Sequence, residues 1–292
     1  MKITTECVPC LIKRIIFEAE LSSKNKKIIT ETIKKACKAM SEYYDPNKSS
    51  ASIATKVHKI VYDSLNDDDP YKDLKIKSNE IAKKLIPKVQ NLLDSSNDPL
   101  KTAMICSIIG NMMDFGIEGA SSSPEKLSEI FDKIYSDGLG HDDYKKLDDI
   151  LSKSKNVLLF TDNCGEVVFD KILCNEIKKK YPKVRLTLVV KGENILSDAT
   201  LEDAKELNFK EVVDEIITTG CFAIGVDFEK LSKQLKKGLD NSDLIICKGM
   251  ANYEAFSETN YRPIAYLLRT KCNAIANSMG LKKGISIIKL YS

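Results

Sequence analysis

The spacing of hydrophobic positions changes near residue 151. Before it, apolar residues recur every three or four positions, as on one face of a helix; Leu11, Ile15 and Ala19 mark one such stripe and Leu85 and Val89 belong to another. Turn-forming clusters that contain proline interrupt this pattern at 45–46, 66–70, 95–99 and 121–124. The pattern therefore predicts an all-helical first half of about six helices.

After residue 151 short apolar runs, rich in β-branched residues, alternate with helical segments. The runs cover residues 157–161, 184–190, 215–219, 244–247, 264–268 and 285–290. Such alternation is typical of a mostly parallel sheet covered by helices. We expect an α/β fold in which a helical N-terminal domain, residues 1–150, packs on a Rossmann-like, mostly parallel sheet formed by residues 151–292. No Pro/Gly-rich linker separates the two, so we expect them to pack tightly and share a cleft.

Composition narrows the class of protein only slightly. With 292 residues, 43% of them hydrophobic, the chain can bury a sizeable core. A formal net charge of +3 does not indicate a nucleic-acid partner. No apolar run approaches the ~20 residues that cross a bilayer, and the N-terminus carries no apolar signal region, so no membrane partner is expected. The 9 cysteines, an odd number, argue against a disulfide framework and for a cytoplasmic protein. The oligomeric state is left open.

Polar residues follow the first two predicted strands directly. Asp162 and Asn163 end the first, Lys191 ends the second, and Asp198 lies in the loop before the next helix. In open α/β sheets ligands bind beyond the carboxyl ends of strands. Asp162, Asn163 and Asp198 offer hard oxygen ligands, which suit Mg²⁺ or Mn²⁺ better than a closed zinc site. The alternative for Asp198 is a cap on the helix that follows.

The fourth predicted strand ends in Lys248 and Gly249, with Asn252 and Glu254 close behind. A lysine beside a glycine at a strand end suits phosphate, because glycine lets backbone N–H groups approach while the ammonium supplies charge. A solvated lysine beside a turn glycine is the alternative. Polar residues at several strand ends together indicate a site at one edge of the sheet.

The helical half adds further polar candidates. Asn111 and Asp114 lie three residues apart on one helix face in an otherwise apolar segment, where polar groups need a partner or a function. A polar cluster at 69–79 opens another helix, and capping explains only its first residue. Both segments could line the substrate cleft or be structural.

The pair Cys7 and Cys10 has CxxC spacing. It could be structural, form one edge of a metal site, or act as a redox pair. His58 and Cys37 could supply further metal ligands, but nothing in the spacing selects them, and His58 is more typical of a partly exposed helix residue.

Six segments, taken in order, resemble the metal-dependent damage-control phosphatase family over nearly the whole chain: CVPC, DPYKDLKIKSN, GNMMDFG, FTDNCGE, VVKGENILSDAT and CKGMANYE. The CxxC pair is similar to the small prokaryotic and archaeal branch. The resemblance implies that Asp162, Asn163 and Asp198 hold one divalent metal ion, Mn²⁺, Co²⁺, Ni²⁺ or Mg²⁺. The family usually reads DNAGE and NDAT; here Cys164 and Ser197 stand at the neighbouring positions, and neither change removes a ligand.

The activity implied by the resemblance is hydrolysis of phosphate monoesters of small metabolites, either sugar phosphates or damaged phosphorylated cofactors. A metal shared between a phosphoryl oxygen and a water would neutralise charge and position the nucleophile. Asp162 and Asp198 would then serve catalysis, Lys248 would stabilise phosphoryl charge, and Asp114 or Glu254 would orient water or protonate the leaving oxygen. The residues expected to bind substrate are Asn111, Lys191, Gly249 and Asn252.

Three other functions stay open on sequence grounds. A non-catalytic module that binds metal or a phosphorylated metabolite would carry the same residues. A haloacid-dehalogenase-type hydrolase would also place Asp162 after its first strand, but that chemistry usually needs a second acid two residues on, where Cys164 stands. A SAM-dependent carboxyl methyltransferase or a dinucleotide enzyme should show a glycine-rich turn there, whereas DNCGE has a single glycine.

Overall fold

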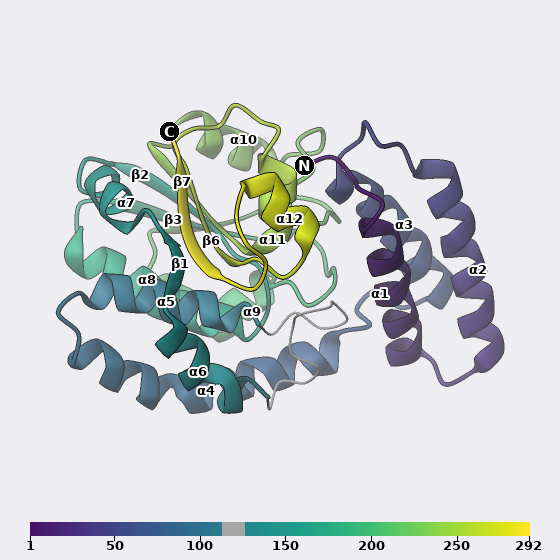
Figure 1. Ribbon diagram of the computed structural model, residues 1–292, viewed down its shortest axis with the longest axis horizontal. Coiled ribbons are helices and arrows are strands. Elements are labelled where there is room, and N and C mark those ends of the chain that lie inside the picture. The colour runs from purple at the N-terminus through teal and green to yellow at the C-terminus, as the bar shows by residue number, and fades with distance from the viewer. Residues whose placement is uncertain (113–125) are drawn as a thin grey trace.

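The computed structural model describes residues 1–112 and 126–292 (Figure 1). Its helices are α1 (Cys7–Ser22), α2 (Lys26–Tyr43), α3 (Ser50–Leu65), α4 (Lys72–Asp94), α5 (Pro99–Gly110), α6 (Lys126–Asp137), α7 (Tyr144–Leu151), α8 (Glu166–Lys180), α9 (Leu201–Glu206), α10 (Lys233–Asp240), α11 (Gly249–Phe256) and α12 (Asn273–Met279). Its strands are β1 (Leu139–Asp142), β2 (Asn156–Phe160), β3 (Arg185–Val190), β4 (Glu215–Thr218), β5 (Leu244–Lys248), β6 (Ile264–Arg269) and β7 (Ser286–Tyr291).

The strands of the described residues form one sheet of seven in the order β1-β7-β6-β5-β2-β3-β4. Every neighbouring pair is parallel except β6 and β7, which are antiparallel. The predicted α/β class with a mostly parallel sheet is therefore confirmed. β2 lies between β3 and β5, and its residues from Val157 to Phe160 are buried, which explains their unbroken apolar run. β1 was not predicted and lies at the edge of the sheet, beside β7.

Helix α5 is buried over most of its surface. It packs against α4, α6, α8, β6 and β7, so little of it faces solvent and its sequence is mostly apolar. It approaches α8 closely at Gly110, where a Cβ would lie 2.7 Å from a ring carbon of Phe169. Figure 1 shows α5 and α8 on one side of the sheet and α10 on the other. Helices from both halves of the chain thus share one core, while the division at residue 150 stays a prediction.

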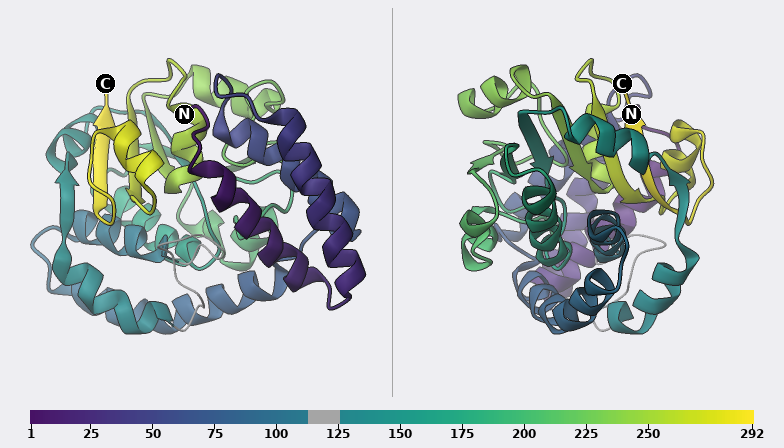
Figure 2. Two further views of the ribbon diagram at one scale, coloured as in Figure 1. Left: turned by 45° about the vertical axis from the view of Figure 1, so that its right-hand side comes forward. Right: turned by 90° about the vertical axis from the view of Figure 1, so that its left-hand side faces the viewer.

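Helices α1, α2 and α3 pack on one another and form a group at one end of the molecule, seen from a second side in Figure 2. Side chains of α3 bond this group to the rest of the chain. The Ser50 hydroxyl donates to Glu254 Oε2 over 2.5 Å, and the Thr55 hydroxyl accepts from the backbone N–H of Ile224 over 2.9 Å. In the described residues, every helix is too short or too polar to cross a membrane.

Candidate active site

The loops that follow β2 and β3 are joined through their backbones. Asn163 and Asp198 form an isolated antiparallel bridge, and the N–H of Ala199 donates to the carbonyl of Asp162 over 2.8 Å. The three predicted metal ligands are therefore brought together beyond the carboxyl ends of adjacent parallel strands. Asp198 does not cap the following helix, because Thr200 occupies the N-cap of α9.

Neighbouring amides fix the Asp162 carboxylate. Its Oδ2 accepts hydrogen bonds from Asn163 Nδ2 over 2.8 Å and from Asn111 Nδ2 over 3.0 Å. The hydroxyl of Ser197 donates to Asn163 Oδ1 over 2.7 Å, which holds that amide in turn. Asn111, expected at the substrate, is fully buried, and within the described part of the chain its Oδ1 has no hydrogen-bond partner. Its amide therefore helps to fix the position of the Asp162 carboxylate through this hydrogen bond.

Gly249 allows β5 to end directly against Asp162. Its φ is +71°, a left-handed conformation, and a Cβ at this position would lie 1.8 Å from Asp162 Oδ2. The glycine is therefore explained by the space that the carboxylate occupies. A contact between Gly249 and substrate stays a prediction.

The Lys248 ammonium lies in a buried ion cluster. It pairs with Glu166 Oε1, lies 3.0 Å from Asp170 Oδ1 and donates to the carbonyl of Ser107 over 3.2 Å. Burial alone would lower the pKa of Lys248, but Asp170 and Glu166 outweigh it and raise the pKa above its ordinary value. Because Lys248 is fully buried and already paired, this placement does not favour the predicted contact with phosphate.

The sequence did not single out Glu166 and Asp170, although both belong to the support of the site. Glu166 Oε2 accepts from Asn111 Nδ2 over 2.8 Å, while its other oxygen pairs with Lys248. The signal that could have found them is two acids four residues apart at the start of an otherwise apolar helix.

Two other predicted residues bond within the same region. Lys191 is 2% exposed and its ammonium lies 3.2 Å from Asp198 Oδ2, so it supplies a positive charge beside a predicted metal ligand. Asn252 Nδ2 donates to the carbonyls of Thr161 over 3.0 Å and Lys248 over 2.7 Å, which ties the ends of β2 and β5 together. Asp114 falls outside the described residues.

A cavity of about 410 Å³ opens between the α1–α3 group and this edge of the sheet. Asp162, Asn163, Asp198 and Glu254 contribute to its lining. Cations from both sides also line it: Lys13 and Arg14 of α1, and Lys283. Carboxylate and amide oxygens on one wall and cations on another suit a ligand that combines a divalent metal ion with an anion.

The donor set at this wall fits a hard divalent cation. Asp162 and Asp198 are each 4% exposed, and an amide oxygen of Asn163 lies between their loops. Two carboxylates so well shielded from water are stabilised by a nearby positive charge. A divalent cation would add to the charge that Lys191 already supplies. All of these donors are oxygens, the ligands that Mg²⁺ and Mn²⁺ prefer.

The CxxC pair lines the same cavity. Cys7 and Cys10 contribute to its lining together with Cys272. Burial raises the pKa of Cys272 to about 11, so its thiol stays protonated at neutral pH. Within residues 1–112 and 126–292, no group of three or more His, Cys, Asp or Glu side chains could hold a metal ion. This disfavours a CxxC metal site completed by His58 or Cys37.

The prediction that His58 is partly exposed was wrong. His58 is fully buried, lines the cavity, and places Nδ1 2.8 Å from Glu18 Oε2. Glu18 lies on α1 and is also fully buried.

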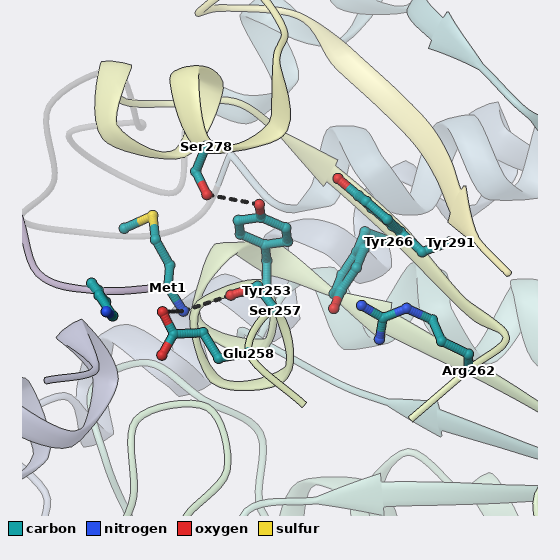
Figure 3. A pocket seen from close by; sticks show the side chains of 9 residues that line it. Met1, Tyr253, Ser257, Glu258, Arg262, Tyr266, Ser278 and Tyr291 are labelled. Carbon is teal, nitrogen blue, oxygen red and sulfur yellow. Dashed lines mark hydrogen bonds and ion pairs between the residues drawn. The ribbon is translucent and has the colours of Figure 1, made fainter. Parts of the chain in front are cut away.

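A second cavity, of about 450 Å³, is shown in Figure 3. Its walls carry three tyrosines, Tyr253, Tyr266 and Tyr291, and the Tyr253 hydroxyl lies 2.8 Å from Ser278 Oγ. None of the predicted site residues lines it.

Comparison with known proteins gives matches over almost the whole chain. A family model described as the damage-control phosphatase ARMT1-like domain matches residues 3–287. A damage-control phosphatase of Archaeoglobus fulgidus is 37% identical over 290 residues, which cover 99% of each chain. Damage-control phosphatase PH1575 of Pyrococcus horikoshii is 31% identical over 284 residues, 97% of this chain and 96% of that one. The crystal structure of a DUF89 family protein from Pyrococcus horikoshii superposes with a TM-score of 0.89 at 30% identity, covering 99% of both chains. The chain therefore belongs to the damage-control phosphatase family.

Proposed function

We propose that this protein is a metal-dependent phosphatase that hydrolyses phosphate monoesters of small metabolites, such as sugar phosphates or damaged phosphorylated cofactors. The observation that carries the proposal is the wall of the 410 Å³ cavity on which Asp162, Asn163 and Asp198 meet. Family membership supports the phosphatase class. The metal dependence and the type of ester are the parts that we propose.

The cavity also supports a small substrate. Its volume of about 410 Å³ is in the range of small-molecule pockets, roughly 300–1,000 Å³. The cations Lys13, Arg14 and Lys283 in its lining would attract a phosphate group. A sugar phosphate or a phosphorylated cofactor fragment meets both conditions.

Asp162, Asn163 and Asp198 would hold the metal ion. When bound, that ion would polarise the phosphoryl group and lower the pKa of a water molecule. Asn111 and Ser197 would keep the ligands in place through their hydrogen bonds to Asp162 and Asn163.

The test uses protein stripped of metal by a chelator and assayed with p-nitrophenyl phosphate and a panel of sugar phosphates, with Mg²⁺, Mn²⁺, Co²⁺ or Ni²⁺ restored singly. We expect phosphate release that requires metal and is lost in Asp162→Asn, which removes one charge with little change of shape. Calorimetry should show that this variant binds metal at least ~10-fold more weakly.

The matched control is Asp63→Asn, at an exposed position of α3 where the carboxylate lies 3.0 Å from the ammonium of Lys59. This variant should keep both metal affinity and turnover. Metal binding without release of phosphate from any ester would contradict the enzyme and support a non-catalytic binding module. Turnover that is indifferent to chelation would contradict metal dependence.

A further inference from the structure

The mechanism proposed above leaves one pair of buried titratable groups unused. His58 on α3 and Glu18 on α1 are both fully buried, and Nδ1 of His58 lies 2.8 Å from Glu18 Oε2. The other ring nitrogen, Nε2, is buried and has no hydrogen-bond partner among the described residues. Because His58 lines the cavity that contains Asp162 and Asp198, a ligand there could supply the missing partner.

The fold places His58 in the lining of the cavity that also contains the candidate metal site. Thr55, His58 and Tyr62 are spaced by three and four residues, so they share one face of α3. Thr55 and Tyr62 bond this face to two loops of the sheet edge, through the N–H groups of Ile224 and Leu196, each over 2.9 Å. The loop that contains Leu196 continues directly to Asp198. His58 is therefore held between two anchored residues of α3, in the lining of the cavity that the predicted metal ligands share.

Glu18 also determines which nitrogen can react. A carboxylate facing Nδ1 favours a proton on that nitrogen and orients the ring. Nε2 is then the atom through which the imidazole can exchange a proton with a bound molecule. Glu254, the acid suggested by sequence for proton transfer, also lines the cavity, and its Oε2 accepts a hydrogen bond from Ser50.

We propose that His58 is the proton donor to the leaving-group oxygen of the phosphate ester and that Glu18 is its positioning residue. This inference rests on the proposed phosphatase function. A sugar or other alkoxide is a poor leaving group, and a positioned acid accelerates its departure by roughly 10²–10⁴-fold.

The step balances with water as the only co-reactant. The oxygen of water bonds to phosphorus and keeps one proton in the hydrogen phosphate product. The bond between phosphorus and the leaving oxygen breaks, its electron pair stays on that oxygen, and the Nε2 proton of His58 joins it to form the alcohol. The second proton of the water passes to solvent, from which Nε2 is protonated again.

The experiment compares metal-loaded wild type, His58→Gln and Glu18→Gln on esters whose leaving groups differ in basicity. Propyl phosphate leaves as a strongly basic alkoxide, whereas p-nitrophenyl phosphate leaves as a weakly basic phenolate. We expect His58→Gln to lower kcat/KM for propyl phosphate by ~10²-fold or more, with a loss at least ~10-fold smaller for p-nitrophenyl phosphate. Glu18→Gln should show the same pattern with a smaller loss. Metal affinity should not change in either variant.

Nitrogen NMR gives a readout that does not depend on turnover. The chain has 2 histidines, so ¹⁵N-histidine spectra with His141→Asn as the assignment variant isolate His58. We expect a protonated Nδ1 in wild type that is perturbed by Glu18→Gln.

Three outcomes would overturn the proposal. Equal losses of kcat/KM for both esters in His58→Gln would show a structural role. A fall in metal affinity in that variant would assign His58 to the metal site. An Nδ1 without its proton would exclude the proposed role of Glu18, which is to hold a proton on Nδ1 and leave Nε2 to react. If wild type releases phosphate from no ester, the sugar-phosphate panel included, with any metal, the phosphatase proposal itself fails, which the wild-type assay shows without reference to the variants.

Discussion

Gly249→Ala tests the link between the end of β5 and the candidate metal site. A Cβ at this position would lie 1.8 Å from Asp162 Oδ2, whereas real Cβ contacts are essentially never shorter than 3.0 Å. The carboxylate, or the strand end that carries the new methyl group, must therefore move by more than about 1 Å, and a displacement of that size in an active site can cost about 10²-fold in rate. The φ of +71° adds a backbone penalty of about 1–2 kcal/mol.

Gly280→Ala separates these two effects. Gly280 ends α12 with a φ of +67°, and a Cβ there would meet nothing within 4 Å. Gly280→Ala should lose about 1–2 kcal/mol of unfolding free energy in urea titrations, because it places alanine in a left-handed conformation. Gly249→Ala should lose more than that, because the clash with Asp162 adds to the same backbone penalty. Only Gly249→Ala should also lose metal affinity, by at least ~10-fold in calorimetry, and kcat/KM for phosphate esters, by about 10²-fold.

Equal metal affinity in the two variants would contradict a link between the end of β5 and the metal site. In that case the Asp162 carboxylate would tolerate a shift of more than about 1 Å, and its position could not be what holds the metal. Equal turnover in both variants would lead to the same conclusion.

Two further predictions concern charged groups. Lys248→Met leaves two buried carboxylates without their cation, so urea titrations should show a loss of about 3–5 kcal/mol in unfolding free energy. The control Lys83→Met, at an ion pair on the surface, should lose less than about 1 kcal/mol. Equal losses would contradict a stabilising role for the buried cluster. Burial would raise the pKa of Asp143, but hydrogen bonds from Lys146 and His141 outweigh it and lower the pKa to about 2 from 3.8. Its ionised form therefore stabilises the fold above pH ~4, and this contribution is lost as pH falls towards 2. Wild type should be more stable than Asp143→Asn at neutral pH, with the difference shrinking through that window; a difference independent of pH would contradict it.

Local sequence predicted most of the fold because most elements bury a regular apolar pattern. The breaks at 45–46, 66–70 and 95–99 fall between observed helices, and the break at 121–124 lies outside the described residues. Strand β1 was missed because Leu139–Asp142 has no apolar alternation. Its extended state comes from pairing with β7, nearly 150 residues later, which no local pattern contains.

The sequence predicted the site residues only where they follow the carboxyl ends of parallel strands, at which ligands bind in such sheets. Asp162 and Asp198 follow adjacent parallel strands, so the rule for strand ends brings them together. The surroundings of Lys248 and His58 were not predictable, because each depends on helices that pack over it from distant parts of the chain. The sequence predicts Lys248 at phosphate, with a solvated lysine as the alternative, yet it bonds to a carbonyl of α5, and His58 meets an acid on α1.

The burial of α5 also has a consequence for the order in which the chain is made. Its residues emerge from the ribosome before α8, β6 and β7, which cover it in the folded protein. At translation rates of 5–20 residues per second, the last of these partners follows on the order of 10–40 s later. This apolar helix is therefore exposed until its partners have been made, so we expect a nascent chain that pauses after α5 to aggregate more readily than one that pauses before it.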